Sequence, residues 1–296
     1  MPMRTVRTIS EIRMALKTLR EGGHRIGFVP TMGFLHEGHA SLIKQSTARC
    51  NSTVVSVFVN PTQFGPSEDL SRYPRDLDRD QNLCLKLGVD VLFLPEASEL
   101  YPTGFSTFVE PGPLSENLCG KFRPGHFRGV ATVVAKLFNI VQPDLAFFGQ
   151  KDLQQIAVIR RMIKDLNMPV DIIAVPTVRE ADGLAMSSRN SYLSPEDRQR
   201  ALCLHRGLTA ASEAFQGGER RVSRLAEIAR NHFEGVDEIQ YSQLVDAGTM
   251  EPLAGEVTRA AALCVAAVVG KTRLIDNVLL SPTDEGVQFI NHLDPS

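Results

Sequence analysis

The chain has 296 residues, of which 43% are hydrophobic, and this length accommodates one large or two ordinary domains with a hydrophobic core. Its 32 basic and 34 acidic residues leave a formal charge of -2, which excludes recruitment of nucleic acid or an anionic membrane by the field of the whole chain. An anionic ligand must therefore be bound by a local group of residues. The five cysteines are widely separated and lack C-x-x-C spacing, which predicts reduced thiols in a cytoplasmic protein.

The N-terminal stretch predicts a helix with Ser10 as its N-cap, and it lacks the apolar region of a signal peptide. The longest apolar run, residues 260–269, is about half of the roughly 20 residues that a membrane helix requires. We therefore expect a soluble protein.

Short β-branched or aromatic runs alternate with helical patterns up to about residue 176. Strands are predicted at residues 25–29, 52–59, 89–94, 144–149 and 170–175, and helices at residues 38–50, 77–88, 129–141 and 153–166. This alternation favours a parallel sheet with helices on both faces, because parallel strands need long crossover connections. In such sheets ligands bind at the carboxyl ends of the strands.

A different pattern follows residue 177. Two charged helical stretches are succeeded by three strand-like segments, at residues 195–215, 219–234, 238–247, 261–270 and 272–280. We predict an α/β, Rossmann-like parallel-sheet nucleotide-binding domain over residues 1–177, followed by a smaller α+β C-terminal domain over residues 178–296. The tail, residues 291–296, is expected to be frayed.

The segment VPTMGFLHEGHASL, residues 29–42, joins a predicted strand to a predicted helix and places His36 and His39 three residues apart. Unpaired amides and a partial positive charge at a helix N-terminus suit a phosphate, and Gly33 and Gly38 allow the ligand to approach the backbone. The two imidazoles share one face of the first turn and can both donate hydrogen bonds to a phosphoryl group. Alternatively, the histidines of a bare HxxH motif serve as helix caps or core residues.

This context resembles the HxGH signature of the nucleotidyltransferase superfamily, which is shared with class I aminoacyl-tRNA synthetases, and the whole segment is similar to the pantothenate synthetase family. Residues 58–80, 125–155 and 176–198 resemble further segments of that family in the same order. Together the four segments cover most of residues 25–200 and are far more specific than HxGH alone. The resemblance implies ATP-dependent condensation of (R)-pantoate with β-alanine, through a pantoyl adenylate, to pantothenate, AMP and diphosphate.

The resemblance also implies the residues of the site. It gives catalytic roles to His36, His39 and Lys151. It implies an ATP site formed by Met32, Gly33, Phe34, Leu35, His36, Glu37, Gly38, His39, Gly149, Gln150, Lys151, Asp152, Val178, Met186, Ser187, Ser188 and Arg189. The family often has Glu in place of Gln150. The segment MSSRN resembles the KMSKS-type loop, with Ala185 at the place of the first lysine and Arg189 at that of the second cation.

Two glutamines are implied as ligands of pantoate, Gln63 and Gln155, and Gln63 also meets β-alanine. Their amides can both donate and accept hydrogen bonds, which fits a ligand with hydroxyl and carboxylate groups. Pro30, Met32 and Phe64 either form an apolar wall for pantoate or belong to the ordinary core.

Mg²⁺ is expected to arrive with ATP, with Asp80 as a candidate contact, although a stretch rich in Asp and Arg is also typical of a solvated helix face. Arg123, His126 and Arg128 are candidates to line the site. The family resemblance further suggests a homodimer. We expect no nucleic-acid or membrane partner.

Two other functions are compatible with parts of this pattern. One is a plain adenylyltransferase or a former of aminoacyl adenylates, although the chain has no long tRNA-binding appendage and no basic stripe. The other is a regulatory protein that binds a nucleotide without catalysis, which the joint presence of His36, His39, Lys151 and Arg189 disfavours. A test of which carboxylate and which amine support the release of AMP and diphosphate from ATP would distinguish these two functions from the condensation of pantoate with β-alanine.

Overall fold

The computed structural model describes residues 2–282 and divides the chain into two compact units. Unit 1 comprises the chain up to Gly112 and residues 123–150 and 158–175, and unit 2 comprises residues 113–122, 151–157 and the chain from Pro176 onward. Two short segments that precede residue 177 thus belong to unit 2. The tail at residues 291–296 lies outside the described residues.

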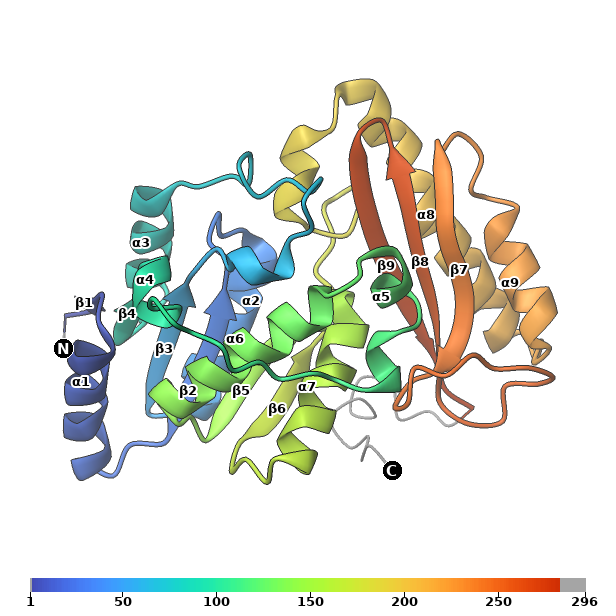
Figure 1. Cartoon of the computed structure of the whole chain (residues 1–296). Helices are drawn as coiled ribbons and strands as arrows, with labels where there is room; N and C mark the ends of the chain where they lie inside the picture. Colours follow the sequence, from blue (N-terminus) through green and yellow to red (C-terminus); the bar gives the residue numbers. More distant parts are fainter. Residues whose placement is uncertain (1, 283–296) are drawn as a thin grey trace. The chain divides into compact units, whose positions relative to one another are not determined.

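Unit 1 is built on a six-stranded parallel sheet in the order β1-β4-β3-β2-β5-β6 (Figure 1). Its strands are β1 (Arg4–Val6), β2 (Ile26–Thr31), β3 (Ser52–Val57), β4 (Val91–Phe93), β5 (Leu145–Gly149) and β6 (Asp171–Val175). The connecting helices are α1 (Ile9–Glu21), α2 (Glu37–Arg49), α3 (Leu77–Lys86), α4 (Ala97–Leu100), α6 (His126–Val141) and α7 (Leu153–Asp165), whose first residues belong to unit 2. The predicted α/β parallel-sheet fold is therefore confirmed.

Helices cover both faces of this sheet. The ring of Phe138 on α6 contacts those of Phe28 and Phe148, with centroid separations of 6.4 and 6.5 Å. Leu42 of α2 instead joins the buried cluster around Val29. Because successive side chains of a strand point to opposite faces, Phe28 and Val29 serve two different layers of core.

Two local features differ from the predictions for the N-terminal region. The N-cap of α1 is Thr8 rather than Ser10: the Thr8 side chain accepts from the backbone N–H of Glu11, and the Glu11 carboxylate accepts from the backbone N–H of Thr8, which forms a capping box. The edge strand β1 was not predicted. It is three residues long and mostly exposed, so it carries no hydrophobic alternation, and it forms through parallel pairing with β4.

The strand order reverses between β2 and β5. From β2 the chain proceeds to β3 and β4 on one side, whereas β5 and β6 lie on the other side. Diverging connections leave a crevice at the carboxyl ends of the two strands that flank such a reversal, and ligands bind there in open α/β sheets. The His36 loop follows β2 and residue Gln150 follows β5, so both predicted segments of unit 1 start at this point.

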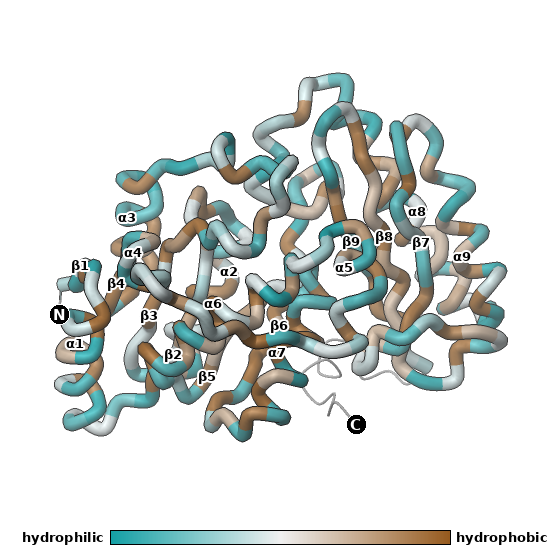
Figure 2. Tube along the Cα trace, viewed as in Figure 1, coloured by the Kyte–Doolittle hydropathy of each residue, from teal (hydrophilic) through white to brown (hydrophobic). Residues whose placement is uncertain are grey.

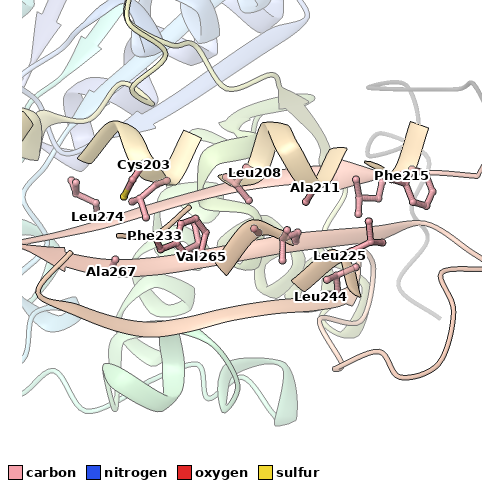
Figure 3. Packing of buried hydrophobic residues seen from close by; sticks show 14 of the residues in the cluster. Cys203, Leu208, Ala211, Phe215, Leu225, Phe233, Leu244, Val265, Ala267 and Leu274 are labelled. Carbon is pink, nitrogen blue, oxygen red and sulfur yellow. The ribbon is translucent and has the colours of Figure 1, made fainter. Parts of the chain in front are cut away.

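Unit 2 contains an antiparallel sheet in the order β7-β8-β9, formed by β7 (Glu238–Asp246), β8 (Ala261–Val269) and β9 (Thr272–Leu280). All nine residues of β8 are hydrophobic, as expected for a central strand (Figure 2). The helices α8 (Pro195–Gln216) and α9 (Val222–Arg230) contribute Leu208 and Leu225 to the core over this sheet (Figure 3). A short helix α5 (Cys119–Phe122) also belongs to the unit. The predicted smaller α+β part is confirmed.

No helix in residues 2–282 is both long enough and apolar enough to cross a membrane.

Candidate active site

His36 and His39 form the N-terminal cap of α2. His36 is the N-cap residue, and its Nδ1 accepts a hydrogen bond from the backbone N–H of Gly38 at 3.1 Å. The Nδ1 of His39 accepts from the backbone N–H of His36 at 3.3 Å, so the two residues form a reciprocal capping box. Their rings lie 4.1 Å apart between centroids. The spacing of three residues therefore brings both imidazoles to one end of one helix.

These caps also determine the tautomer of each ring. Because Nδ1 of His36 and of His39 accepts an N–H group, the proton of the neutral imidazole resides on Nε2. In its neutral form each ring thus carries its N–H on Nε2, at a helix N-terminus whose amides attract negative charge. The capping function and a phosphate-binding function use different nitrogens, so they are compatible.

The loop between β2 and α2 is held by Asp80 of α3. Its two carboxylate oxygens accept the backbone N–H groups of Phe34 at 2.8 Å and Leu35 at 2.6 Å. Gly33 has φ +85°, and a Cβ at this residue would lie 2.8 Å from a methyl carbon of Val57 and 3.0 Å from Asp80 Oδ2. Only glycine fits this conformation and space without a shift of its neighbours.

Burial raises the pKa of Asp80, and the hydrogen bonds from Leu35 and Phe34 oppose that rise. Each of the two carboxylate oxygens accepts one backbone N–H group, and these two bonds order the loop. Among residues 2–282, no group of three or more His, Cys, Asp or Glu side chains is arranged to hold a metal ion. The Mg²⁺ contact at Asp80 stays a prediction. In the structure, Asp80 holds the backbone of the loop between β2 and α2.

Gln63 lies in a short 3-10 turn, η1 (Pro61–Gln63), and its side chain is oriented by two neighbours. The Nδ2 of the buried Asn60 donates to Gln63 Oε1 at 3.1 Å, and Gln63 Nε2 lies 3.1 Å from Met32 Sδ. The predicted Gln63 and the predicted Met32 are thereby in contact. Asn60 itself is held by Tyr101, whose hydroxyl donates to Asn60 Oδ1 at 2.8 Å.

A second group of polar residues holds the backbone of this turn. His126 Nδ1 lies 2.9 Å from the carbonyl oxygen of Gln63, and Arg123 lies 3.1 Å from His126 Nε2. Arg123 is paired through two hydrogen bonds with Glu68, at 2.8 and 2.6 Å. Burial raises the pKa of Glu68, but Arg123 outweighs this effect and lowers it overall. Arg128, by contrast, pairs with the exposed Glu110.

The apolar candidates have ordinary surroundings. Phe64 contacts Tyr73 edge to face, with ring centroids 5.9 Å apart, and Pro30 lies within β2. These positions are compatible with either interpretation of the two residues.

The segment after β5 carries Gly149 and Gln150 in unit 1, and Lys151 and Asp152 in unit 2. Residues Gln150–Asp152 form the 3-10 turn η3. Lys151 Nζ lies 3.3 Å from the Asp152 carboxylate, and its carbonyl oxygen accepts from Asn277 Nδ2 at 3.0 Å.

Two consecutive glutamines at the start of α7 behave differently. Gln154 is buried and structural: its Oε1 accepts the backbone N–H of Cys119, and its Nε2 donates to the carbonyls of Leu114 and Asn117. The half-buried Gln155 makes no side-chain hydrogen bond to any other residue in the described part of the chain. The amide of Gln155 is thus available to a ligand.

The predicted loop at residues 186–189 directly follows a small hairpin of unit 2, in which Arg179 pairs with Ala185. The carbonyl of Val178 accepts the backbone N–H of Met186 at 3.0 Å. Ser187 caps the 3-10 turn η4 (Ser188–Tyr192), its hydroxyl accepting the backbone N–H of Arg189 at 3.3 Å. The hairpin accounts for the positions of Val178 and Met186, and the capped turn η4 accounts for those of Ser187 and Ser188.

Comparison with known proteins identifies the family. The family model described as pantoate-beta-alanine ligase matches residues 4–279. The chain belongs to this family. The pantothenate synthetase 1 of Bradyrhizobium diazoefficiens is 61% identical over 279 residues, which are 94% of this chain and 99% of that protein.

Solved structures of the pantoate-beta-alanine ligase family share the fold of this chain. The pantothenate synthetase of Thermus thermophilus is 48% identical, with a TM-score of 0.89 over 95% of this chain and 100% of that chain. The pantoate-beta-alanine ligase of Francisella tularensis is 34% identical, with a TM-score of 0.78 over 99% of this chain and 100% of that chain. The Francisella structure is described as a complex with beta-gamma ATP and beta-alanine.

Sequence reasoning missed Asn60, which orients the Gln63 amide. The signal was present in VNPTQ, where an Asn precedes a Pro and can cap the following turn. It also missed Glu68 as the partner of Arg123, because 55 residues separate the two and no local pattern joins them.

Proposed function

We propose that this chain condenses (R)-pantoate with β-alanine at the expense of ATP, and that it yields pantothenate, AMP and diphosphate. Membership of the pantoate-beta-alanine ligase family supports the overall reaction. The structural observation that carries the proposal is the pair of Nε2–H donors of His36 and His39 at the N-terminus of α2, beside the reversal of strand order between β2 and β5.

In the first half-reaction, a carboxylate oxygen of pantoate attacks the α-phosphorus of ATP. An O–P bond forms, the bond between the α-phosphorus and the bridging oxygen breaks, and diphosphate leaves with the electron pair. Negative charge grows on the α-phosphate oxygens and on the diphosphate. The imidazoles of His36 and His39 would donate to this charge, and Lys151 and Arg189 would neutralise it.

In the second half-reaction, the amine of β-alanine attacks the acyl carbon of pantoyl adenylate. The C–N bond forms, the bond from carbon to the AMP oxygen breaks with its electron pair leaving on AMP, and the nitrogen releases a proton to the solvent. Gln63 and Gln155 would hold pantoate through their amides. The orientation of the Gln63 amide by Asn60 and the available amide of Gln155 support these two roles.

The nucleotide would lie along the remaining predicted ATP ligands: the segment from Met32 to His39, Gly149 to Asp152, Val178 and the loop from Met186 to Arg189. Mg²⁺ would enter on the phosphates of ATP, where it offsets their charge, as part of the substrate. We also propose that two copies of the chain form a homodimer, which light scattering would detect. The five free thiols support a cytoplasmic location.

The reaction is tested with purified protein, ATP and Mg²⁺. Exchange of labelled diphosphate into ATP should require (R)-pantoate, and addition of β-alanine should release AMP and pantothenate in equal amounts. A panel of other carboxylates, including amino acids, serves as the control. The proposal is wrong if pantoate elicits no exchange while one of the other carboxylates does.

A further inference from the structure

Two adjacent residues of β9, Asp276 and Asn277, contact two separate segments of unit 2 that carry predicted ATP ligands. Both side chains are buried, with 5% and 3% exposure. Because they are neighbours on a strand, they point to opposite faces of the sheet. Asp276 shares its face with Leu274 and Val278, which pack in the core of the unit, and Asn277 lies on the other face.

On the core face, Asp276 holds the hairpin that leads into residues 186–189. Its Oδ2 and Oδ1 accept hydrogen bonds from Nη1 and Nη2 of Arg179 at 2.6 and 3.0 Å, a bidentate ion pair of low exposure. Arg179 Nη1 also donates to the carbonyl of Gly183 at 3.1 Å, and the backbone of Arg179 pairs with Ala185. The Asp276 carboxylate thus holds the Arg179 side chain, and Arg179 in turn connects the base of the hairpin to its tip.

The hairpin packs closely against α8. Gly183 has φ +95°, and a Cβ there would lie 2.1 Å from Cδ2 of His205. Arg198 of the same helix reaches Glu180 at 2.8 Å and Asp182 at 2.6 Å. The loop at residues 186–189 therefore follows a hairpin that is bound by ion pairs both to strand β9 and to helix α8 of unit 2.

On the opposite face, Asn277 holds the backbone of η3. Its Nδ2 donates to the carbonyl oxygen of Lys151 at 3.0 Å. Lys151 is only 19% exposed in its side chain, so the position of its backbone determines where Nζ can reach. Strand β9 thus contacts both segments, although 126 residues separate Asn277 from Lys151 and 97 separate Asp276 from Arg179.

We infer that Asp276 and Asn277 are positioning residues, which hold Lys151 and the loop at residues 186–189 at the positions from which they contact the triphosphate of ATP. This inference rests on the proposed function of those two segments. A displacement of about 1 Å at a reacting group can cost about 100-fold in rate, so small shifts of either segment should slow the step that uses the triphosphate. Only the first half-reaction uses it.

The experiment measures the two half-reactions separately in the full chain. Rapid-quench single turnovers give the rate of pantoyl adenylate formation from ATP and pantoate. A second mixing step, with β-alanine added to the preformed adenylate complex, gives the rate of amide formation. The variants are Asp276→Asn, Asn277→Ala and Arg179→Lys, the last keeping the charge but losing the bidentate geometry. Asp246→Asn is the matched control, because Asp246 also pairs with an arginine, Arg259, within unit 2.

We expect adenylate formation to slow by about 10- to 100-fold in the three variants, with amide formation within about twofold of wild type. The control should leave both rates unchanged, even if its melting temperature falls. Unchanged adenylate formation in folded Asn277→Ala and Arg179→Lys would refute the inference, as would a parallel loss of both half-reactions in proportion to a lowered melting temperature. If Asp276→Asn does not fold, the other two variants decide. A wild-type chain that forms no adenylate from pantoate would instead refute the proposed function.

Discussion

Replacement of His39 by Asn separates the two functions that the structure gives to this side chain. The amide oxygen of Asn can stand near Nδ1, so it can still accept the backbone N–H of His36, but no donor remains at the place of Nε2. Loss of one donor to a developing oxyanion costs about 2.7 to 4 kcal/mol, or about 10² to 10³ in kcat. The cap bond is long, at 3.3 Å, so even its complete loss should cost only the lower part of about 0.5 to 2 kcal/mol.

We therefore expect His39→Asn to slow pantoyl adenylate formation by about 10² to 10³ while its melting temperature stays close to that of wild type. The matched variant is His39→Gln, whose longer amide reaches toward the place of Nε2 and abandons the cap. It should retain more of the rate and lose more of the stability than His39→Asn. Single-turnover formation of the adenylate, together with a thermal melt and ATP binding by calorimetry, measures all three quantities. A folded His39→Asn variant with the wild-type rate would show that these imidazoles are caps and nothing more.

Three further predictions concern the pantoate side of unit 1. Gln63→Ala should lose far more in kcat/KM for pantoate than in ATP affinity, and steady-state kinetics with each substrate varied in turn would show the difference. Gly129→Ala should raise KM for pantoate, because a Cβ there would lie 2.6 Å from Cα of Gln63 and push the η1 turn away. Gly112→Ala is its control, since a Cβ at Gly112 meets nothing within 4 Å, and equal kinetics in the two variants would contradict the prediction. The pKa of Glu68 is lowered in the folded state despite its burial, because Arg123 pairs with it. Its contribution to stability is therefore present above the unfolded pKa of about 4.3 and disappears as the pH falls through the lower folded value. Urea melts at a series of pH values should show a flatter acid dependence for Glu68→Gln than for wild type, and identical slopes would argue against this assignment.

The sequence alone determined the main features of the fold and of the first predicted segment. The alternation of β-branched runs and helical patterns predicted the strands β2, β3, β4, β5 and β6 and the parallel sheet, because burial on both faces leaves continuous apolar runs. The spacing of His36 and His39 placed both rings on one turn, since residues three apart on a helix are neighbours. The Thr8 cap was also readable, because Glu11 follows it at the spacing of a capping box.

Only the tertiary structure decided which groups hold the predicted residues in place. Asp80 meets the backbone of Leu35 across 45 residues, and Asn277 meets that of Lys151 across 126. No periodicity connects such pairs, because their contact depends on the order and register of strands rather than on local conformation. The edge strand β1 was decided in the same way, since backbone pairing with β4 forms it without a buried side-chain pattern. Local spacing fixes which side chains share a turn or a face, whereas the packing of distant segments fixes the direction in which each functional group points.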